Sequence, residues 1–407
     1  MEIMKARKKV NQLLEFLEDN KRKLILISVP IGTVILIIAG LYAIGGVRLS
    51  LKFDNITENI ILPSGFKIET FASDLGGSVV SVPGPNPGPR MMLLKDGVLF
   101  VTVPSQGRVV ALPDTNKDNK ADQAITFLDS LNNPHGIDFY NGWFYIAEED
   151  RVIRVKEANN SLVADRDSLQ VLTSLPSGSH FTRTLKIFNA SLYVSVGSDC
   201  NVCIEADWRR ASIMKCDLEG KNCATFARGL RNAVGFVFSP TGKMYATENG
   251  RDWLGDNTPP DEINLIEGGK DYGWPFCYGK NIHDTDFDHN VYVTNPCQEP
   301  FETPSLVDLQ AHSAPLGLAF YNGTSFPEEY SGSLFVAFHG SWNRGVATGY
   351  KIVNINMNNL TVRDFATGWL QGINVIGRPV DIIVAGDGSL FVSDDNAGRI
   401  YRIYYSG

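Results

Sequence analysis

The sequence predicts an all-β, six-bladed β-propeller preceded by one N-terminal transmembrane helix. Three observations carry this prediction: a strand motif recurs six times, its copies are spaced like propeller blades, and an uncharged apolar segment lies near the N-terminus. Each copy is a short apolar strand with an aromatic residue near its centre, preceded by the Gly or Asn-Ala that a hairpin turn requires. The six aromatic residues are Phe100, Tyr145, Tyr193, Tyr245, Phe335 and Phe391.

The spacing of these aromatic residues is that of propeller blades. Successive steps are 45, 48, 52, 90 and 56 residues, and a four-stranded blade takes about 40–50 residues. The step of 90 is one blade plus an insertion, which we place at about 251–311, where Asp, Pro, Gly and Cys are frequent. Short strands between turn residues fill the rest, without helical periodicity. We therefore expect the propeller to span 61–407 and to close into a ring, which removes most free strand edges.

The apolar segment at 24–47 contains no charged residue and is rich in Ile, Leu and Val. About 20 apolar residues cross a hydrocarbon core of about 30 Å. Basic residues are concentrated before it, so residues 1–23 are expected in the cytoplasm, with 48–60 as a linker to an extracytoplasmic propeller. A cleaved signal peptide is the alternative. The segment exceeds the usual signal core of about 7–15 residues and no A-x-A site follows it, which favours an uncleaved single-pass anchor in the cell membrane.

Charge and cysteine usage agree with an exported domain. The chain of 407 residues has a formal net charge of −8 and no long basic run outside its N-terminus, so we expect no nucleic-acid partner. All six cysteines lie in the predicted outside domain, and an even number there favours disulfides, with Cys277–Cys297 closing a loop. A zinc site is the alternative, but no His lies among the first four cysteines. The six are Cys200, Cys203, Cys216, Cys223, Cys277 and Cys297.

Cationic and polar residues open the strand that precedes each aromatic strand. Equivalent positions of successive blades form a ring about the propeller axis, so this register predicts a cationic, His-containing rosette at one mouth of the channel. The alternative is that each residue only links blade loops. Several like charges would repel one another without an anion, so a polyanionic ligand is the natural partner, and a neutral His could act as general base. The rosette residues are Arg90, His135, His180, Arg183, Arg231, Asn232, His312 and Arg378.

An ordered string of motifs runs through the fourth repeat. Residues 229–235 read GLRNAVG, 246–250 read ATENG, 260–264 read PDEIN and 272–275 read YGWP. This string resembles the soluble glucose dehydrogenase and aldose sugar dehydrogenase family (glucose/sorbosone dehydrogenases), which use pyrroloquinoline quinone (PQQ). The similarity runs from about residue 60 to the C-terminus.

The resemblance implies a PQQ- and calcium-dependent dehydrogenase that oxidises aldose sugars at C1 to lactones, and the apolar segment at 24–47 adds the membrane anchor. His180 matches the family's catalytic base, which takes the proton of the C1 hydroxyl while hydride passes to the quinone. Arg231 and Asn232 match an Arg-Asn pair over the quinone, where the Arg would stabilise developing negative charge. A sugar is then the substrate, and a quinone or a redox protein is the expected electron acceptor.

The same resemblance implies further cofactor and metal ligands. His135 stands where the family often has Gln, Arg344 lies near a cofactor-binding Lys, and Arg378 lies near a cofactor-binding Arg. Arg183 and His312 of the rosette complete the expected cofactor contacts. The backbone carbonyls of two residues would hold the active-site calcium, and two others match a second, structural calcium site. These four residues are Gly250 and Arg251, then Glu262 and Tyr272.

Two questions remain open at this level. Residues 114–122 read DTNKDNKAD, which resembles a calcium loop, but Asn119 replaces its Gly and Ile125 its final Glu, so a plain polar turn is an equal interpretation. The function also has two alternatives: a non-catalytic propeller that binds protein or glycan ligands, and a calcium-dependent lactonase. The lactonase needs oxygen ligands at the axis, where the rosette offers Arg and His.

Overall fold

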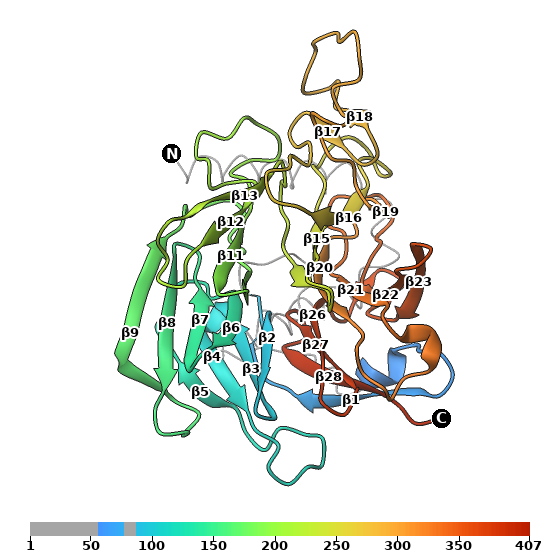
Figure 1. The fold of residues 1–407 in the computed structure, drawn as a ribbon. Helices are drawn as coiled ribbons and strands as arrows, with labels where there is room; N and C mark the ends of the chain where they lie inside the picture. Colours follow the sequence, from blue (N-terminus) through green and yellow to red (C-terminus); the bar gives the residue numbers. More distant parts are fainter. Residues whose placement is uncertain (1–55, 77–86) are drawn as a thin grey trace, which may run out of the picture. The chain divides into compact units, whose positions relative to one another are not determined.

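The computed structural model describes residues 56–76 and 87–407, which form six four-stranded antiparallel sheets (Figure 1). The first is β2 (Met92–Lys95), β3 (Val98–Val103), β4 (Arg108–Leu112) and β5 (Ile125–Leu128). The second is β6 (Gly136–Tyr140), β7 (Trp143–Ala147), β8 (Arg151–Glu157) and β9 (Ala164–Ser174). The third is β10 (Leu185–Phe188), β11 (Ser191–Val196), β12 (Ser212–Cys216) and β13 (Ala224–Arg228).

The remaining sheets follow the same order. The fourth is β14 (Phe236–Phe238), β15 (Met244–Glu248), β16 (Asp261–Ile266) and β19 (Val307–Leu309). The fifth is β20 (Pro315–Phe320), β21 (Leu334–Phe338), β22 (Lys351–Asn356) and β23 (Thr361–Ala366). The sixth is β26 (Pro379–Val384), β27 (Leu390–Asp394), β28 (Arg399–Tyr405) and β1 (Phe66–Ala72). Smaller elements are the hairpins β17 (Cys277–Tyr278)–β18 (Ile282–His283) and β24 (Leu370–Gln371)–β25 (Asn374–Val375), with the 3-10 helices η1 (Ile56–Asn59), η2 (Pro104–Gln106) and η3 (Glu328–Tyr330).

The innermost strands close a ring. Strands β2, β6, β10, β14, β20 and β26 each contact the next, and β26 contacts β2 again. A cavity of about 350 Å³ lies between them, with Lys186 and Asp381 among apolar lining residues. The predicted six-bladed propeller is therefore confirmed, and all six aromatic residues of the repeat fall in the second strand of their blades.

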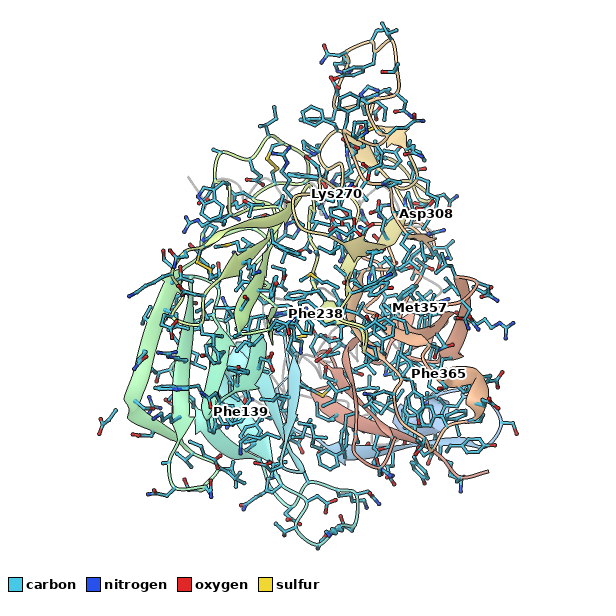
Figure 2. All side chains as sticks on the ribbon, in the orientation of Figure 1. Phe139, Phe238, Lys270, Asp308, Met357 and Phe365 are labelled. Atoms are coloured by element: carbon cyan, nitrogen blue, oxygen red, sulfur yellow. A yellow bond between two sulfur atoms is a disulfide. The ribbon has the colours of Figure 1, made fainter. Side chains whose placement is uncertain are left out.

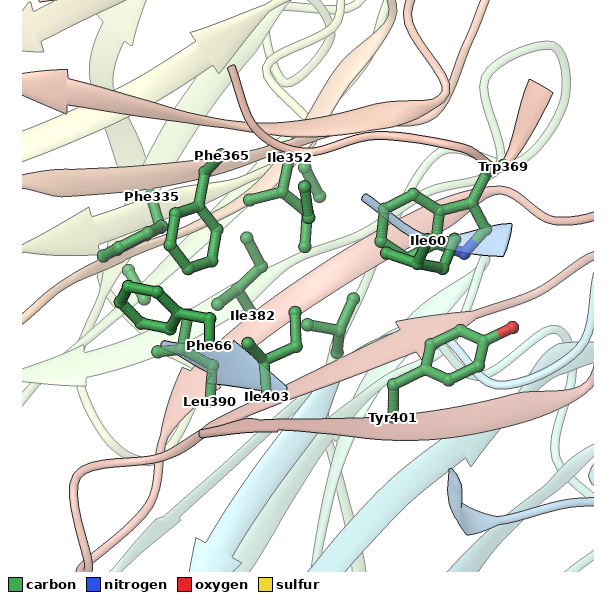
Figure 3. Packing of buried hydrophobic residues seen from close by; sticks show 14 of the residues in the cluster. Ile60, Phe66, Phe335, Ile352, Phe365, Trp369, Ile382, Leu390, Tyr401 and Ile403 are labelled. Atoms are coloured by element: carbon green, nitrogen blue, oxygen red, sulfur yellow. The ribbon is translucent and has the colours of Figure 1, made fainter. Parts of the chain in front are cut away.

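The sixth blade joins the two ends of the propeller. Its outermost strand is β1, which pairs antiparallel with β28 over Phe66↔Tyr405 to Ala72↔Ile400. Phe66 packs edge-on against Phe365 of the fifth blade, with ring centroids 5.0 Å apart, and Phe365 lies 4.7 Å from Phe335 (Figure 3). Burial of one such aromatic ring contributes about 1.5–3 kcal/mol. The N-terminal strand is thus held by a hydrophobic core as well as by backbone hydrogen bonds.

The predicted insertion, residues 251–311, includes residues that belong to the fourth blade itself. Strands β16 and β19 lie inside that range but are the third and fourth strands of the fourth blade. Both strands are short apolar runs between loops rich in Asp, Pro and Gly, so the composition of the whole range indicated a loop insertion rather than strands. The inserted chain is instead the loop before β16 and residues 267–306, which carry the hairpin β17–β18 at the top of Figure 1.

Three disulfides confirm the predicted oxidised state of the cysteines. They join Cys200–Cys203, Cys216–Cys223 and Cys277–Cys297, with sulfur drawn in yellow in Figure 2. The last pair closes the loop of residues 267–306 as expected. All six cysteines are paired, so the zinc alternative has no thiolate to offer.

Among residues 56–76 and 87–407 no helix is long and apolar enough to cross a bilayer. The predicted cytoplasmic segment at 1–23, the span at 24–47 and most of the linker at 48–60 lie outside the described residues.

Candidate active site

His180 lies in the loop between β9 and β10, and its tautomer is fixed by Ser198. Its Nδ1 lies 2.8 Å from the carbonyl oxygen of Ser198. A carbonyl only accepts, so Nδ1 carries the proton and Nε2 keeps its lone pair. No described residue bonds that Nε2. Burial, and secondly the charge of Arg231, lower the pKa of His180 from 6.5 to about 4. At neutral pH the ring is therefore a neutral base with a free acceptor nitrogen.

Arg183 fixes the loop that carries His180. Its Nη1 donates to the carbonyl oxygens of His180 and Thr182 at 2.5 and 2.7 Å, and its Nη2 donates to Pro176 O at 2.5 Å. The side chain is fully buried, and burial lowers its pKa to about 10. The guanidinium of Arg183 is therefore hydrogen-bonded to carbonyls of its own loop. Arg183 acts here as a positioning residue for His180.

Arg231 supplies a fixed positive charge beside His180. It lies between β13 and β14, is 5% exposed, and donates to the carbonyl oxygens of Asn249 and Gly250 at 3.1 and 2.9 Å. Its Nη2 lies 3.2 Å from Asp252 Oδ2 and 3.0 Å from Asn201 Oδ1. Its Nε donates to Asn201 O at 2.9 Å, so every nitrogen of the guanidinium has a partner and the charge is held in one place.

Asn232 joins His180 in one cluster. Its amide oxygen accepts from Thr182 Oγ1 at 3.4 Å, and its backbone N donates to Glu248 Oε1 at 2.8 Å. A Cβ atom at Gly197 would stand 2.7 Å from His180 Cβ and 2.8 Å from Asn232 Oδ1. Only glycine allows the backbone to approach both side chains so closely.

A second cluster links the fifth, sixth and first blades. His339 Nε2 lies 2.9 Å from Asp395 Oδ1, and Arg90 Nη1 lies 2.6 Å from Asp395 Oδ2. Arg378 Nη1 donates to Gly340 O at 3.0 Å and lies 3.5 Å from His339 Nδ1.

Phe181 connects the two clusters, because it follows His180 in the chain. Arg90 Cζ lies 5.6 Å from the centroid of the Phe181 ring. His135 meets the same ring edge-on at 6.1 Å. His135 is fully buried; its Nδ1 lies 3.3 Å from Thr184 Oγ1 and its Nε2 has no partner among the described residues. Burial, then Arg90, lower the pKa of His135 well below its usual value, so its ring is neutral.

His312 and Arg344 bind the loop before β16. His312 Nε2 lies 2.8 Å from Gly255 O. Arg344 Nη1 donates to Ala311 O at 3.0 Å, and its Nη2 donates to Asn257 Oδ1 at 2.8 Å. These two predicted cofactor ligands therefore hold the loop that leaves Gly250, and among the described residues neither contacts His180 or Arg231.

The predicted metal residues line one small cavity together with Glu248 and Arg231. Glu248 is 5% exposed, and its Oε2 has no partner among the described residues. Glu262 accepts from Gly279 N at 2.6 Å and from Asn264 Nδ2 at 2.9 Å. Burial raises the pKa of Glu262 to about 7 and that of Glu248 well above its usual range.

Glu302 adds a third carboxyl near this cavity: burial, with Asp271 and Glu262, raises its pKa to about 8. Buried carboxylates without a counter-ion, one of them with a free oxygen, fit a hard cation with oxygen ligands such as calcium.

Two of the other predicted metal ligands have protein partners of their own. Gly250 O accepts from Arg231. The Arg251 side chain pairs with Asp284 at 2.7 Å, but its predicted ligand atom is the backbone carbonyl oxygen, which this pair does not involve. The Tyr272 hydroxyl donates to Leu265 O at 2.6 Å.

In the loop at 114–122, the carboxylate oxygens of the Asp side chains accept hydrogen bonds from backbone N–H groups of the same loop. Asp114 accepts from the backbone N of Asp118 and Asn119 at 3.1 and 3.0 Å, and Asp122 Oδ2 accepts from Thr115 N at 2.8 Å. Such contacts are those of a polar turn.

The comparisons with known proteins identify the family. A family model described as TrAA12-like matches residues 86–406.

The chain belongs to the TrAA12-like family.

Relatives of this TrAA12-like protein include an uncharacterised protein of Borreliella burgdorferi, 36% identical over 88% of this chain and 94% of that protein. A pyrroloquinoline quinone-dependent pyranose dehydrogenase of Coprinopsis cinerea is 25% identical, over 66% of this chain and 46% of that protein. The chain thus spans about half the length of that enzyme.

Two solved structures share the fold of the TrAA12-like protein. One is the holo form of the pyranose dehydrogenase PQQ domain from Coprinopsis cinerea, with a TM-score of 0.69, 21% identity and coverage of 85% of this chain and 97% of that one. The other is a calcium structure of a Trichoderma reesei family AA12 protein, with a TM-score of 0.70, 21% identity and coverage of 86% and 97%.

Sequence reasoning missed two residues of the candidate site, His339 and Asp395. Each is the residue directly after the second strand of its blade, β21 and β27. Asn249, which bonds Arg231, follows β15 in the same way. A polar residue directly follows the aromatic strand in four of the six blades, at Glu148, Asn249, His339 and Asp395, and this second register could have revealed them.

Proposed function

We propose that this TrAA12-like protein is a PQQ- and calcium-dependent dehydrogenase that oxidises aldose sugars at C1 to lactones. The contact between His180 Nδ1 and Ser198 O carries the proposal, because it leaves Nε2 as a neutral base with no other partner. Burial and the adjacent Arg231 lower the pKa of this base and keep it unprotonated at neutral pH. A binding protein has no need of a fixed base next to a fixed cation.

The residues around His180 fit an anionic, acceptor-rich cofactor. Arg90, Arg231 and Arg378 supply three cations, with His339 between two of them. Arg90 Nε has no partner among the described residues and can donate to such a ligand. We expect Arg231, Arg378, Arg90 and Asn232 to hold PQQ, and Glu248 and Glu262 to hold calcium. Bound PQQ would supply the acceptor for the hydride of the sugar.

In this proposal His180 accepts a proton from the sugar, and Arg231 stabilises negative charge that develops during the reaction. Nε2 of His180 takes the proton of the C1 hydroxyl, the C1–H bond breaks with its electron pair leaving as hydride, and the C1–O bond becomes the lactone carbonyl. Arg183 keeps the loop of His180 in place through three carbonyls. Arg231 stabilises negative charge that develops next to the sugar. The electrons then pass to a quinone or a redox protein.

Dye reduction by the reconstituted protein tests this proposal. Full-length protein loaded with PQQ and CaCl₂ should reduce an artificial dye when given at least one sugar from a panel of aldoses. Addition of EDTA should remove the activity, and CaCl₂ should restore it. A protein that binds PQQ and calcium but turns over none of these aldoses would contradict the proposal.

We further propose that residues 24–47 anchor the enzyme in the cell membrane with the propeller outside. The apolar segment, the basic residues before it and the three disulfides of the propeller support this topology. Protease added to intact cells should cleave the propeller. If the propeller is cleaved only after lysis, the orientation is the opposite one.

A further inference from the structure

Two exposed tryptophans lie beside the candidate active site. Trp253 is 69% exposed and Trp342 is 58% exposed. Their ring centroids are 5.4 Å apart and their planes meet at 88°. In an edge-to-face pair the edge of one ring covers a single face of the other, and the exposed fractions show that much of both indole rings stays open to solvent. One residue is in the loop before β16 and the other follows β21, so two blades contribute to a single aromatic surface.

Hydrogen bonds fix the two loops to each other. Asn343 Nδ2 donates to Asp252 Oδ1 at 2.6 Å, directly next to both tryptophans in the chain. Gly345 N lies 3.1 Å from each carboxylate oxygen of Asp256. The aromatic pair is therefore held in one arrangement before any ligand arrives, which lowers the entropy cost of binding.

Asp252 connects this aromatic pair to the catalytic cluster. Its Oδ2 accepts from Arg231 Nη2 at 3.2 Å, and its backbone N donates to Asn201 Oδ1 at 2.7 Å. Trp253 has a φ of 76°, in the left-handed region that bulky residues rarely adopt. Such conformations are concentrated at ligand-binding sites, where surrounding contacts hold them. Here the strained backbone presents an indole ring to solvent next to the partner of Arg231.

We propose that Trp253 and Trp342 form a subsite for a second sugar ring, adjoining the ring that is oxidised. The substrates would then include disaccharides and longer saccharides with a free reducing end. A sugar ring has a C–H-rich face that stacks on indole, while Asp252 and Asp256 offer acceptors to its hydroxyls. Two indole rings are far too small for a stable protein interface of at least about 1,200 Å². The identity of the first ring rests on the proposed function.

Turnover of paired substrates gives the first test. In the PQQ- and calcium-loaded protein, Trp253→Ala and Trp342→Ala should each lower kcat/KM for maltose or cellobiose about tenfold, if stacking on indole contributes as much as base stacking does. The kcat/KM for glucose should stay unchanged. Trp253→Phe should restore part of the loss. Trp208→Ala is the matched control, because Trp208 is 52% exposed and contacts Thr225 of the outer strand β13.

Calorimetric binding gives a second test that needs no turnover. Methyl β-cellobioside and methyl α-maltoside cannot be oxidised at C1, and at least one should bind the wild type more tightly than methyl glucoside does. Both Trp→Ala variants should lose that difference while keeping the wild-type melting temperature. This result would hold even if no aldose were oxidised, so the subsite and the proposed function can fail separately.

Three results would overturn the subsite. One is an equal loss for glucose and disaccharides, which would place the tryptophans on the cofactor or the first ring. Another is unchanged saccharide binding in both variants. The third is loss of electron transfer to a protein acceptor with an unchanged disaccharide preference, which would make the pair a docking surface for that partner.

Discussion

His339 Nε2 lies 2.9 Å from Asp395 Oδ1 in the interior of the ring between the fifth and sixth blades. Burial opposes ionisation of Asp395, but His339 and Arg90 together bring its pKa down to about 2. The carboxylate is therefore charged and accepts the proton of His339 Nε2, which leaves His339 Nδ1 as an acceptor facing Arg378. Burial lowers the pKa of His339 below its usual value, so the contact orients a neutral imidazole between two guanidinium groups.

Removal of the Asp395 carboxylate should destabilise the propeller. Asp395→Ala leaves the buried guanidinium of Arg90 without its ion-pair partner, and breaking such a buried pair costs about 3–5 kcal/mol. Urea unfolding should show a lower midpoint with an unchanged slope. Asp96→Asn is the control, because Asp96 is exposed and pairs only at the surface with Lys95. Equal midpoints for Asp395→Ala and the wild type would contradict this prediction.

His180→Ala should lower aldose turnover by about 10²–10⁴, the usual contribution of a general base. PQQ binding should change little, because the expected cofactor ligands are other residues. We would measure kcat by dye reduction and PQQ affinity by titration on the same preparations. A variant that keeps wild-type kcat would exclude His180 as the base.

Arg231→Ala should harm both turnover and cofactor binding, because it removes the fixed charge beside His180 and frees Asp252. The measurements are the same two assays. Arg228→Ala is the matched control, since Arg228 forms a surface pair with Asp271 and lies outside the cluster. Loss of turnover with intact PQQ affinity would show that Arg231 acts on the sugar alone.

The pKa of His180 should respond to Arg231. In the cofactor-free protein, NMR titration of the imidazole should give a pKa of about 4, compared with 6.5 for a free His. Because the folded pKa is lower than the unfolded one, the neutral ring favours the fold above pH 6.5, and this contribution is lost as the pH falls toward 4. Arg231→Ala should raise the pKa, since Arg231 is the second cause of its depression. An unchanged pKa would mean that burial alone determines it.

Calcium should stabilise the protein more at pH 8 than at pH 5. Burial raises the pKa of Glu262 to about 7, so without metal its contribution to stability is present below its unfolded pKa and is lost as pH rises through 7. Melting temperatures in EDTA should therefore fall between pH 5 and 8, and CaCl₂ should recover the loss. Glu262→Gln should flatten both effects. A calcium effect independent of pH would argue against this carboxyl as a ligand.

The sequence predicted the number of blades well, because a single repeated feature, an aromatic residue in a short apolar strand, marks each blade. Aromatic residues such as Phe100 and Phe335 each occupy a second strand, so their spacing alone predicted six blades. It was less informative about the contacts of charged side chains. Arg183 shares the rosette register, yet it bonds three carbonyls of its own loop. His339 and Asp395 meet only because the ring brings two distant strand ends together. The partner of each charge depends on loop conformations that no strand periodicity encodes.

Because β1 pairs with β28, the sixth blade can form only after the last strand of the propeller has been synthesised. Arg402 pairs with Glu69 at 2.8 Å although the two residues are 333 positions apart. During synthesis, β1 must stay unpaired until nearly every blade has left the ribosome, whereas each disulfide joins residues at most 20 positions apart and can form early. Loss of β28 by truncation or proteolysis would expose the edges of β1 and β27 at once. Open edges of this kind are templates for pairing with other chains, so such fragments would aggregate rather than remain as five-bladed remnants.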